Sequence, residues 1–357
     1  MKHSPLDWYL LAVVLILLAF GVLMVYDASS SSALRDFGDK YYFLKDQLKW
    51  SLLGIAGMVG ASFFNYRRFY KLSPLILIGS LALLALVFIP GFGIRAYGAH
   101  RWINLHFFVL QPSEFAKLAL IIYLSAWFAN REKGRLLPFV VLLVIFVTLI
   151  LLEPDMGTAI ILSGMGLIMY FLSEAPLWHG LALLPFAGVG AFLLILRSSY
   201  RLKRLTTFLD PSADPLGASY HIRQVLIALG SGGLLGLGLG NSRQKYSYLP
   251  EATTDSIFAI IGEELGFIGA IILLAAFAFV FLRGFRIALK AGDKFGKLLA
   301  AGIVSWLALQ TIVNLGSMVA IIPLTGVPLP FVSYGGSALV TEMVAVGILL
   351  NISKNKA

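Results

Sequence analysis

The chain has 357 residues, of which 59% are hydrophobic and 13% are charged, against roughly 25% charged in an ordinary soluble domain. A soluble globular protein is therefore excluded, and the absence of cysteine excludes disulfide scaffolds, thiol nucleophiles and zinc–thiolate sites. A net charge of +10 in so apolar a chain indicates anionic membrane lipids as partners, and no nucleic-acid partner is expected.

Apolar stretches long enough to cross a bilayer recur along the whole chain. A bilayer core requires about 20 apolar residues in a helix. By that measure the sequence predicts ten membrane-spanning helices, at residues 8–26, 48–64, 74–90, 113–129, 137–152, 156–173, 177–196, 256–282, 300–320 and 337–351. We therefore expect an all-α integral membrane protein that forms a single polytopic domain over residues 1–357.

Lys and Arg residues in the short loops predict the orientation. With the N-terminus in the cytoplasm, fourteen of them lie on the cytoplasmic side and six on the outer side, and positive charge favours the cytoplasmic side. Both termini are therefore predicted to be cytoplasmic, with a large extracytoplasmic loop, residues 197–255, between the seventh and eighth helices. Its seven basic residues are either tolerated surface charges or a platform for an anionic ligand at the outer leaflet.

The fourth predicted helix begins with polar residues, among them Glu114 and Lys117. The two are three residues apart and so share one helix face, and charges inside a membrane span are costly and usually functional. They form a structural ion pair, or a site in which Lys117 faces a ligand phosphate and Glu114 orients it, and the two roles are compatible.

The sixth helix begins at Asp155, which serves either as a helix cap or as a carboxylate at the rim of an outward cavity. In the second case it would meet a sugar hydroxyl or a divalent ion.

Residues 220–240 combine a short apolar stretch with repeated glycines, which is typical of an interfacial helix followed by a flexible turn. Asp255 then lies at the outer boundary of the eighth helix, either as a cap or as a general base beside the cationic loop. Glu263 lies about 12 Å deeper along that helix and is expected to pack or relay protons. Residues 323–337 hold three prolines, and we expect this non-helical segment to line a pocket or to form an ordinary loop.

Seven sequence blocks resemble the SEDS family (shape, elongation, division and sporulation), and their residues are most similar to those of its rod-shape, elongation members. The blocks are Arg101–Leu105, Gln111–Lys117, Pro154–Ala159, Gly230–Gly233, Leu249–Asp255, Gly262–Gly266 and Ser333–Ser337. The resemblance implies a peptidoglycan glycosyltransferase that polymerises lipid II at the outer face of the bacterial cytoplasmic membrane. It also implies a class B penicillin-binding protein, the transpeptidase, as partner.

The resemblance and the charge pattern together predict the site residues. Asp255 is expected to be the general base of one inverting displacement, with Lys117 and Glu114 as further catalytic residues. Mg²⁺ or Mn²⁺ at Asp255 or Asp155 is a possible cofactor. The expected substrate-binding residues are Arg101, Trp102, Asp155, Arg223, Gln224, Ser333 and Ser337.

This chain departs from the family pattern beside the predicted base. It has Thr253-Thr254-Asp255-Ser256 where relatives usually carry His-Thr-Asp-Phe, so the motif supplies no histidine partner for the aspartate. Two other functions stay open, a lipid II flippase and a non-catalytic scaffold for the transpeptidase. A flippase should carry charge at several membrane depths, whereas this sequence concentrates charge toward the outer rim.

Overall fold

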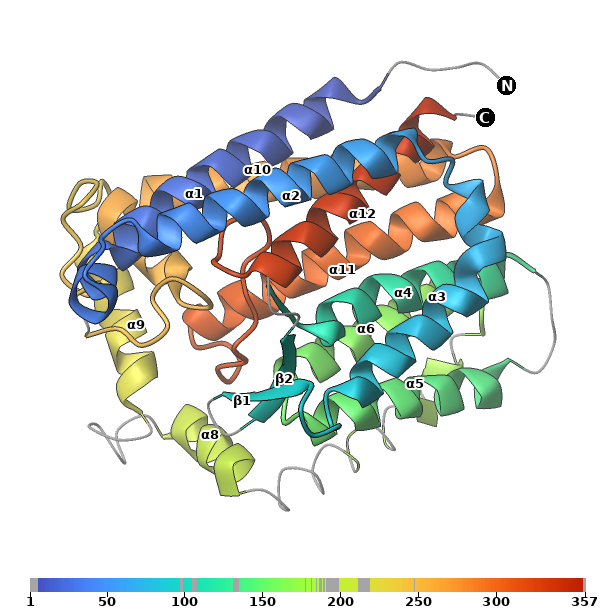
Figure 1. The fold of residues 1–357 in the computed structure, drawn as a ribbon, viewed down its shortest axis with the longest axis horizontal. Helices are drawn as coiled ribbons and strands as arrows, with labels where there is room; N and C mark the ends of the chain where they lie inside the picture. Colours follow the sequence, from blue (N-terminus) through green and yellow to red (C-terminus); the bar gives the residue numbers. More distant parts are fainter. Residues whose placement is uncertain are drawn as a thin grey trace.

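Long helices dominate the chain in the computed structural model (Figure 1). The structure describes residues 6–96, 99–104, 108–130, 135–176, 178–180, 199–210, 219–246 and 248–355, with residues 182, 183, 185, 188 and 190. The helices are α1 (Trp8–Phe37), α2 (Tyr42–Phe63), α3 (Arg67–Leu86), α4 (Pro112–Ala129), α5 (Leu136–Leu152), α6 (Met156–Leu172), α8 (Ser199–Leu209), α9 (Tyr220–Ser231), α10 (Ile257–Lys290), α11 (Lys294–Met318) and α12 (Gly336–Lys354).

The predicted spans coincide with these helices except for the seventh, residues 177–196, which lies largely outside the described residues. Five of the described helices, α1, α3, α10, α11 and α12, are by themselves long and apolar enough to cross a membrane. Helices α5 and α6 are apolar but have only 17 residues each. The chain is thus a multi-pass membrane protein, and the count of ten spans stays a prediction.

A small antiparallel sheet lies between α3 and α4, so the all-α prediction is wrong for this segment. Its strands are β1 (Gly93–Ala96), β2 (Ala99–Asn104) and β3 (Val109–Leu110), in the order β1-β2-β3. Ile94 pairs with Trp102, and Ile103 pairs with Leu110. These β-branched and aromatic residues favour strands, and the ladder satisfies backbone groups beside the membrane that a loop would leave unpaired.

Helices α11 and α12 form the centre of the bundle. Their most apolar windows are 78% and 83% buried, against 22% for α3 and for α10, whose other faces are left for lipid. In Figure 1, α11 and α12 lie between α1 and α2 on one side and α3 to α6 on the other. Gly347 of α12 permits the close approach of α2, because a Cβ there would lie 2.3 Å from the backbone oxygen of Met58.

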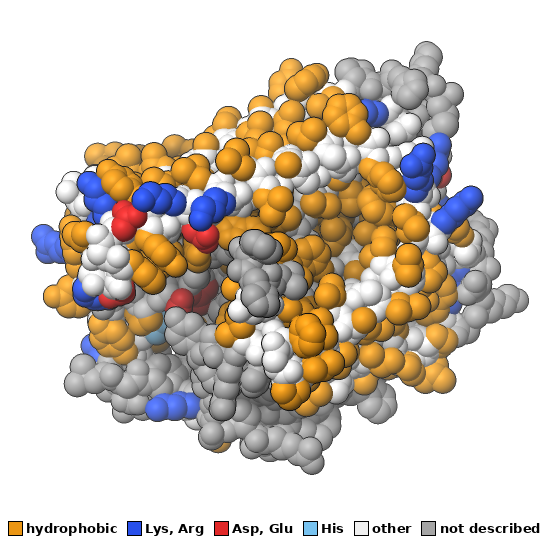
Figure 2. Space-filling view, viewed as in Figure 1, with side chains coloured by type: hydrophobic (Ala, Val, Ile, Leu, Met, Phe, Trp, Pro, Cys, Tyr) orange, Lys and Arg blue, Asp and Glu red, His pale blue; other side chains and the backbone are white. Residues whose placement is uncertain are grey.

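Both chain termini lie at the same end of the bundle (Figure 1). Asp7 pairs with Arg283 at 2.8 Å, and its backbone N–H donates to Ser353 Oγ at 3.3 Å. Figure 2 shows hydrophobic side chains covering the face between two ends at which Lys and Arg gather, as a membrane belt requires. The described ends of the chain thus lie together, which agrees with the predicted topology, while the topology itself and the cytoplasmic location of the termini stay predictions.

Candidate functional site

Asp255 lies in the loop between α9 and α10, close to the start of α10. Its residue surface is 7% exposed, and its Oδ1 accepts a hydrogen bond from Thr254 Oγ1 at 3.2 Å. Its backbone carbonyl accepts from Asn314 Nδ2 of α11 at 2.8 Å. Gly326 faces the other carboxylate oxygen, since a Cβ built there would lie 3.9 Å from Oδ2. Thr254 and Gly326 therefore flank the carboxyl group.

Burial raises the pKa of Asp255 to about 7, and the negative charge of Glu251 adds to that effect. The positive charge of Arg204 on α8 acts in the opposite direction and lowers the pKa of this carboxyl group. A carboxyl with a pKa near neutrality is suited to accept a proton and release it again.

The second half of the non-helical segment of residues 320–335, from Val327 onward, is largely buried and packs against the loop of Asp255. Ser333 Oγ donates to the carbonyl of Thr254, and the Tyr334 N–H donates to the carbonyl of Thr253 at 2.8 Å. Asn314 Nδ2 donates to the Val327 carbonyl at 2.8 Å. Side chains of α11 thus replace the hydrogen bonds that a helix would supply, as non-helical backbone in a membrane requires.

Lys117 is buried in a network that joins α4, α11 and α12. Its Nζ lies 2.8 Å from Glu114 Oε2 and donates to Gln310 Oε1 at 2.8 Å. Gln310 Nε2 donates in turn to Glu342 Oε1 at 2.9 Å and to the Pro328 carbonyl at 3.1 Å. With the Lys117 and Glu114 side chains 1% and 3% exposed, the two residues form the buried ion pair that the sequence predicts, and the phosphate role of Lys117 stays a prediction.

Asp155 caps α6 and is fully occupied in that role. Its Oδ1 accepts from the Thr158 N–H at 3.0 Å and its Oδ2 from Thr158 Oγ1 at 2.9 Å. Gly157, two residues on, packs against the 320–335 segment, since a Cβ there would lie 2.6 Å from the Thr325 carbonyl oxygen. Asp155 and Asp255 therefore flank the same segment.

Arg101 and Glu153 meet beside this cap. Arg101 Nε donates to the backbone carbonyl of Glu153 at 2.9 Å, not to its carboxylate. The Glu153 side chain is buried, and neither of its oxygens has a hydrogen-bond partner. Burial, together with the charge of Asp155, raises the pKa of Glu153 to about 9, so this carboxyl is protonated at neutral pH.

Four other predicted substrate-binding residues make no described hydrogen bond to Asp255. Trp102 is half-buried in β2, while Arg223 is exposed and Gln224 half-buried on α9. Ser337 Oγ accepts from the Gln111 N–H at 3.0 Å and so ties the start of α4 to α12. Among the described residues, no hydrogen bond links any of these four to Asp255, whereas Ser333 lies directly on its loop.

The sequence did not identify His221 of α9, which contacts the residue after Asp255. Its Nε2 lies 2.7 Å from Ser256 Oγ, the residue that precedes α10. Burial and the nearby Arg204 lower the pKa of His221 to about 4, so the imidazole is neutral at pH 7. A histidine therefore supports the aspartate loop from another helix. Asn314 and Gln310 were also not selected from the sequence as site residues, although polar side chains inside an apolar span are a recognised signal of a site.

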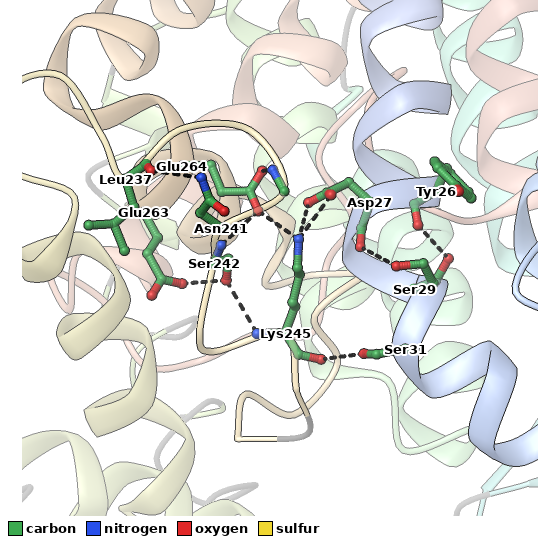
Figure 3. Close-up of polar contacts among 12 residues, drawn as sticks. Tyr26, Asp27, Ser29, Ser31, Leu237, Asn241, Ser242, Lys245, Glu263 and Glu264 are labelled. Atoms are coloured by element: carbon green, nitrogen blue, oxygen red, sulfur yellow. Dashed lines mark hydrogen bonds and ion pairs between the residues drawn. The ribbon is translucent and has the colours of Figure 1, made fainter.

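A second buried cluster anchors the glycine-rich loop of residues 232–246 (Figure 3). Glu264 accepts the backbone N–H groups of Gly240 at 3.1 Å and Ser242 at 3.0 Å. Lys245 Nζ joins Glu264 Oε1 at 3.0 Å to Asp27 Oδ1 of α1 at 2.9 Å. Lys245 is one of the seven basic residues proposed for an anion platform. Its ammonium instead binds Asp27 and Glu264 and so fixes the loop.

Neighbouring Glu263 accepts the Arg243 N–H at 3.1 Å and also bonds Ser242 Oγ. These contacts give Glu263 a role in packing the loop, the first of the two roles predicted for it.

The carboxylates do not gather into an all-protein metal site. Within the described ranges, no group of three or more His, Cys, Asp or Glu residues is arranged to hold a metal ion. Both oxygens of Asp155, a predicted ligand, are engaged at the α6 cap. An ion held by one carboxylate and substrate phosphates needs no such group, so the predicted Mg²⁺ or Mn²⁺ stays a prediction centred on Asp255.

Comparison with known proteins covers the whole length of the chain. The profile of the FtsW/RodA/SpoVE family, described as cell cycle protein, matches residues 7–357. Stage V sporulation protein E of Bacillus subtilis is 41% identical over 360 residues, which cover 99% of this chain and 98% of that protein. A probable peptidoglycan glycosyltransferase FtsW of Trichlorobacter lovleyi is 44% identical over 363 residues, covering 99% and 94%.

Two solved structures are similar to this chain over nearly its whole length. One is a chain of a peptidoglycan synthase complex, described for the structural coordination of polymerization and crosslinking, with a TM-score of 0.81 and 27% sequence identity. The crystal structure of the Thermus thermophilus rod shape determining protein RodA has a TM-score of 0.73 and 28% identity. Each comparison covers 99% of this chain and 98% of the other.

Proposed function

Because the chain belongs to the FtsW/RodA/SpoVE family of the bacterial inner membrane, we propose that it is a peptidoglycan glycosyltransferase that polymerises lipid II. Relatives named peptidoglycan glycosyltransferase at 42–44% identity support the activity. The observation that carries the proposal within this chain is the buried Asp255 carboxyl, with a pKa of about 7, on a loop fixed by α11 and by residues 320–335.

In the proposed reaction Asp255 is the general base. Lipid II carries its sugar through an α-linked pyrophosphate, and the polymer bond is β-1,4, so a single inverting displacement is sufficient. Asp255 takes the proton of the acceptor 4-hydroxyl while that oxygen attacks the anomeric carbon, and the carbon–oxygen bond to pyrophosphate breaks. Undecaprenyl diphosphate leaves as an anion that needs no proton, so a second carboxylate is not required.

Positive charge near Asp255 would stabilise the leaving pyrophosphate. Arg204 meets this requirement best, because its charge already acts on the Asp255 carboxyl. Lys117 is a weaker candidate for direct contact, since Glu114 and Gln310 already bind its Nζ. We assign Lys117 a positioning role, exerted through Gln310 on the carbonyl of Pro328.

We further propose that the chain works with a class B penicillin-binding protein. The similarity to a chain of a synthase complex that couples polymerization and crosslinking supports this partner. The elongation role predicted from the sequence stays a prediction. Relatives named for sporulation and FtsW are 41–44% identical, whereas the RodA structure is 28% identical, and these values favour a division or sporulation role.

The depth of the buried charges favours the polymerase over the flippase. Buried charged residues on α4, α10 and α12 all lie within the first eight residues of their helices, at Glu114, Lys117, Glu263, Glu264 and Glu342. Eight residues of helix span about 12 Å. Charge therefore extends only part of the way across the bilayer, as expected for a site that opens on one side.

The test is glycan synthesis by the purified full-length chain, reconstituted with its penicillin-binding partner and labelled lipid II. Asp255→Asn retains the shape and should lower the rate by about 10²–10⁴-fold, the usual contribution of a general base. Asp36→Asn, an exposed outer carboxylate paired with Arg35, is the matched control and should leave the rate unchanged.

In the unmodified enzyme the rate should fall as the pH drops below about 7, because protonated Asp255 cannot accept a proton. A near-parental rate for Asp255→Asn would refute the base assignment. Lipid II that crosses vesicle membranes without polymer formation would support the flippase instead.

A further inference from the structure

A cavity of about 520 Å³ lies between the start of α5 and the residues that follow α6, and Asp255 is not among the residues that line it. It is lined by Arg135, Leu136, Leu137, Val140, His179 and Leu183. The proposed reaction uses none of these residues.

The cavity lies at the end of the bundle that carries both termini. Asn130, between α4 and Arg135, accepts a hydrogen bond from Tyr70 Oη at 3.1 Å. The Tyr70 ring contacts Phe295 at the start of α11, with 5.5 Å between ring centres. Tyr66, on the same side, donates its N–H to Asn351 near the C-terminus at 3.0 Å. The predicted orientation therefore assigns the cavity to the inner leaflet.

Arg135 lines this cavity and carries unused donors. Its Nε and Nη2 are buried, and neither has a hydrogen-bond partner in the part of the chain that the structure describes. These two nitrogens form one edge of the guanidinium fork, which matches two oxygens of a phosphate. Leaving such charged donors desolvated and unpaired is costly, so an anionic oxygen ligand would stabilise them. The Phe128 ring, 6.0 Å from the guanidinium carbon, supports the side chain.

His179 adds a second polar group to the same wall. Its Nδ1 lies 2.6 Å from Tyr170 Oη, which fixes the ring. When the tyrosine hydroxyl donates to Nδ1, the proton of the neutral imidazole is on Nε2, which can donate to a ligand. Arg135 also precedes the N-terminus of the 17-residue helix α5, where the helix dipole favours negative charge.

The remaining cavity residues are apolar and continue into a lipid-facing stripe. Leu137, Val141 and Val144 follow one another at helical spacings of four and three, and are 72%, 50% and 55% exposed. An acyl chain leaving the cavity would lie along this stripe. A free phosphate would make no use of it, so the combination favours a phospholipid.

We propose that this cavity is a binding site for an anionic phospholipid. The headgroup phosphate accepts hydrogen bonds from Arg135 Nε and Nη2 and from the Nε2–H of His179. One acyl chain lies along the exposed apolar stripe of α5. The site is separate from the glycosyltransferase centre, and it would hold α5 and the segment after α6 to inner-leaflet lipid.

Native mass spectrometry of the detergent-purified full-length chain tests the proposal. Phosphatidylglycerol should be retained in preference to phosphatidylcholine. Arg135→Gln should weaken phosphatidylglycerol binding by about tenfold, the value of one charge-assisted hydrogen-bonding group, and leave phosphatidylcholine unchanged. The matched control is Arg68→Gln, an exposed arginine at the same end that also contacts a phenylalanine ring, Phe64, at 5.5 Å.

Equal phosphatidylglycerol retention by Arg135→Gln and the parental chain would overturn the proposal. So would an absence of preference for phosphatidylglycerol in the parental chain, a result that requires no variant. Displacement of the lipid by inorganic phosphate at an equal concentration would assign the cavity to a free anion instead. If Arg135→Gln does not fold, Arg135→Lys keeps the charge without the fork and should still bind phosphatidylglycerol less tightly.

Discussion

Replacing Lys245 with methionine removes the cation that holds two carboxylates, Asp27 and Glu264, beneath the glycine-rich loop of residues 232–246. The Lys245 side chain is 4% exposed, and its partners Asp27 and Glu264 are 18% and 0% exposed. Breaking a buried ion pair by removal of one partner costs about 3–5 kcal/mol, because the remaining charges are left uncompensated. At about 1.4 kcal/mol per factor of ten, local opening of the loop should rise by about a hundredfold to a few thousandfold.

Hydrogen–deuterium exchange measured by mass spectrometry reports this opening directly. The N–H groups of Gly240, Ser242 and Arg243 donate to the Glu263 and Glu264 carboxylates, so peptides over residues 240–245 should exchange at least a hundredfold faster in Lys245→Met. Peptides from α12 should be unaffected.

Lys45→Met is the matched control for this measurement. Lys45 pairs with Asp39 at 2.7 Å, but the two side chains are 65% and 38% exposed. Exposed pairs contribute at most about 1 kcal/mol, so exchange should change by less than about fivefold. An increase below tenfold in Lys245→Met would refute the reasoning, since the carboxylates would then hold the loop without the lysine.

Two further predictions concern the outer end of the bundle. The pKa of Glu153 is about 9 in the folded chain against an ordinary 4.5, so stability from this group is complete below pH 4.5 and falls as the pH rises to about 9. The slope is at most about 1.4 kcal/mol per pH unit. Glu153→Gln should therefore raise the unfolding temperature at pH 8 and have little effect at pH 4; equal shifts would contradict the assignment. His221→Ala should lower kcat for glycan synthesis by about tenfold at unchanged KM for lipid II, by releasing Ser256 beside Asp255. His221→Gln, whose amide can still bond Ser256, should retain most activity, and the acidic limb near pH 7 should persist in both variants. An equal loss of activity in the two variants would show that the contact of His221 with Ser256 does not account for it.

Helix positions were predictable because apolar length alone determines them. For the predicted spans that lie in the described residues, the predicted start falls within about two helical turns of the observed helix start. Helix α1, however, continues past the predicted end at residue 26 to Phe37. The sheet was missed because strands of two to six residues give too short a pattern beside 20-residue helices.

The arrangement of the site was only partly predictable. Asp255 and Ser333 were selected from short motifs, and the structure brings them to the same loop. The contact of His221 with Ser256 joins residues 35 apart, and the bond of Gln310 to Pro328 joins a helix to a segment with no regular period. Side-chain bonds to irregular backbone leave no periodic signal, so these partners emerge only when the chain is folded.

The way in which α11 supports the proline-rich segment affects how the function of Lys117 is inferred. Gln310 and Asn314, one helical turn apart, bond the carbonyls of Pro328 and Val327, and Asn314 also bonds the carbonyl of Asp255. Lys117 fixes the orientation of Gln310 by bonding its Oε1. Removing Lys117 would thus loosen the backbone next to the base even if no phosphate ever touched its ammonium. Loss of activity in a Lys117 variant is consequently expected from either role. The described hydrogen bonds use two of the three donors of the ammonium, and the Lys117 side chain is 1% exposed. The positioning role therefore requires no rearrangement of the network, whereas a phosphate could reach the third donor only if the surrounding packing opened.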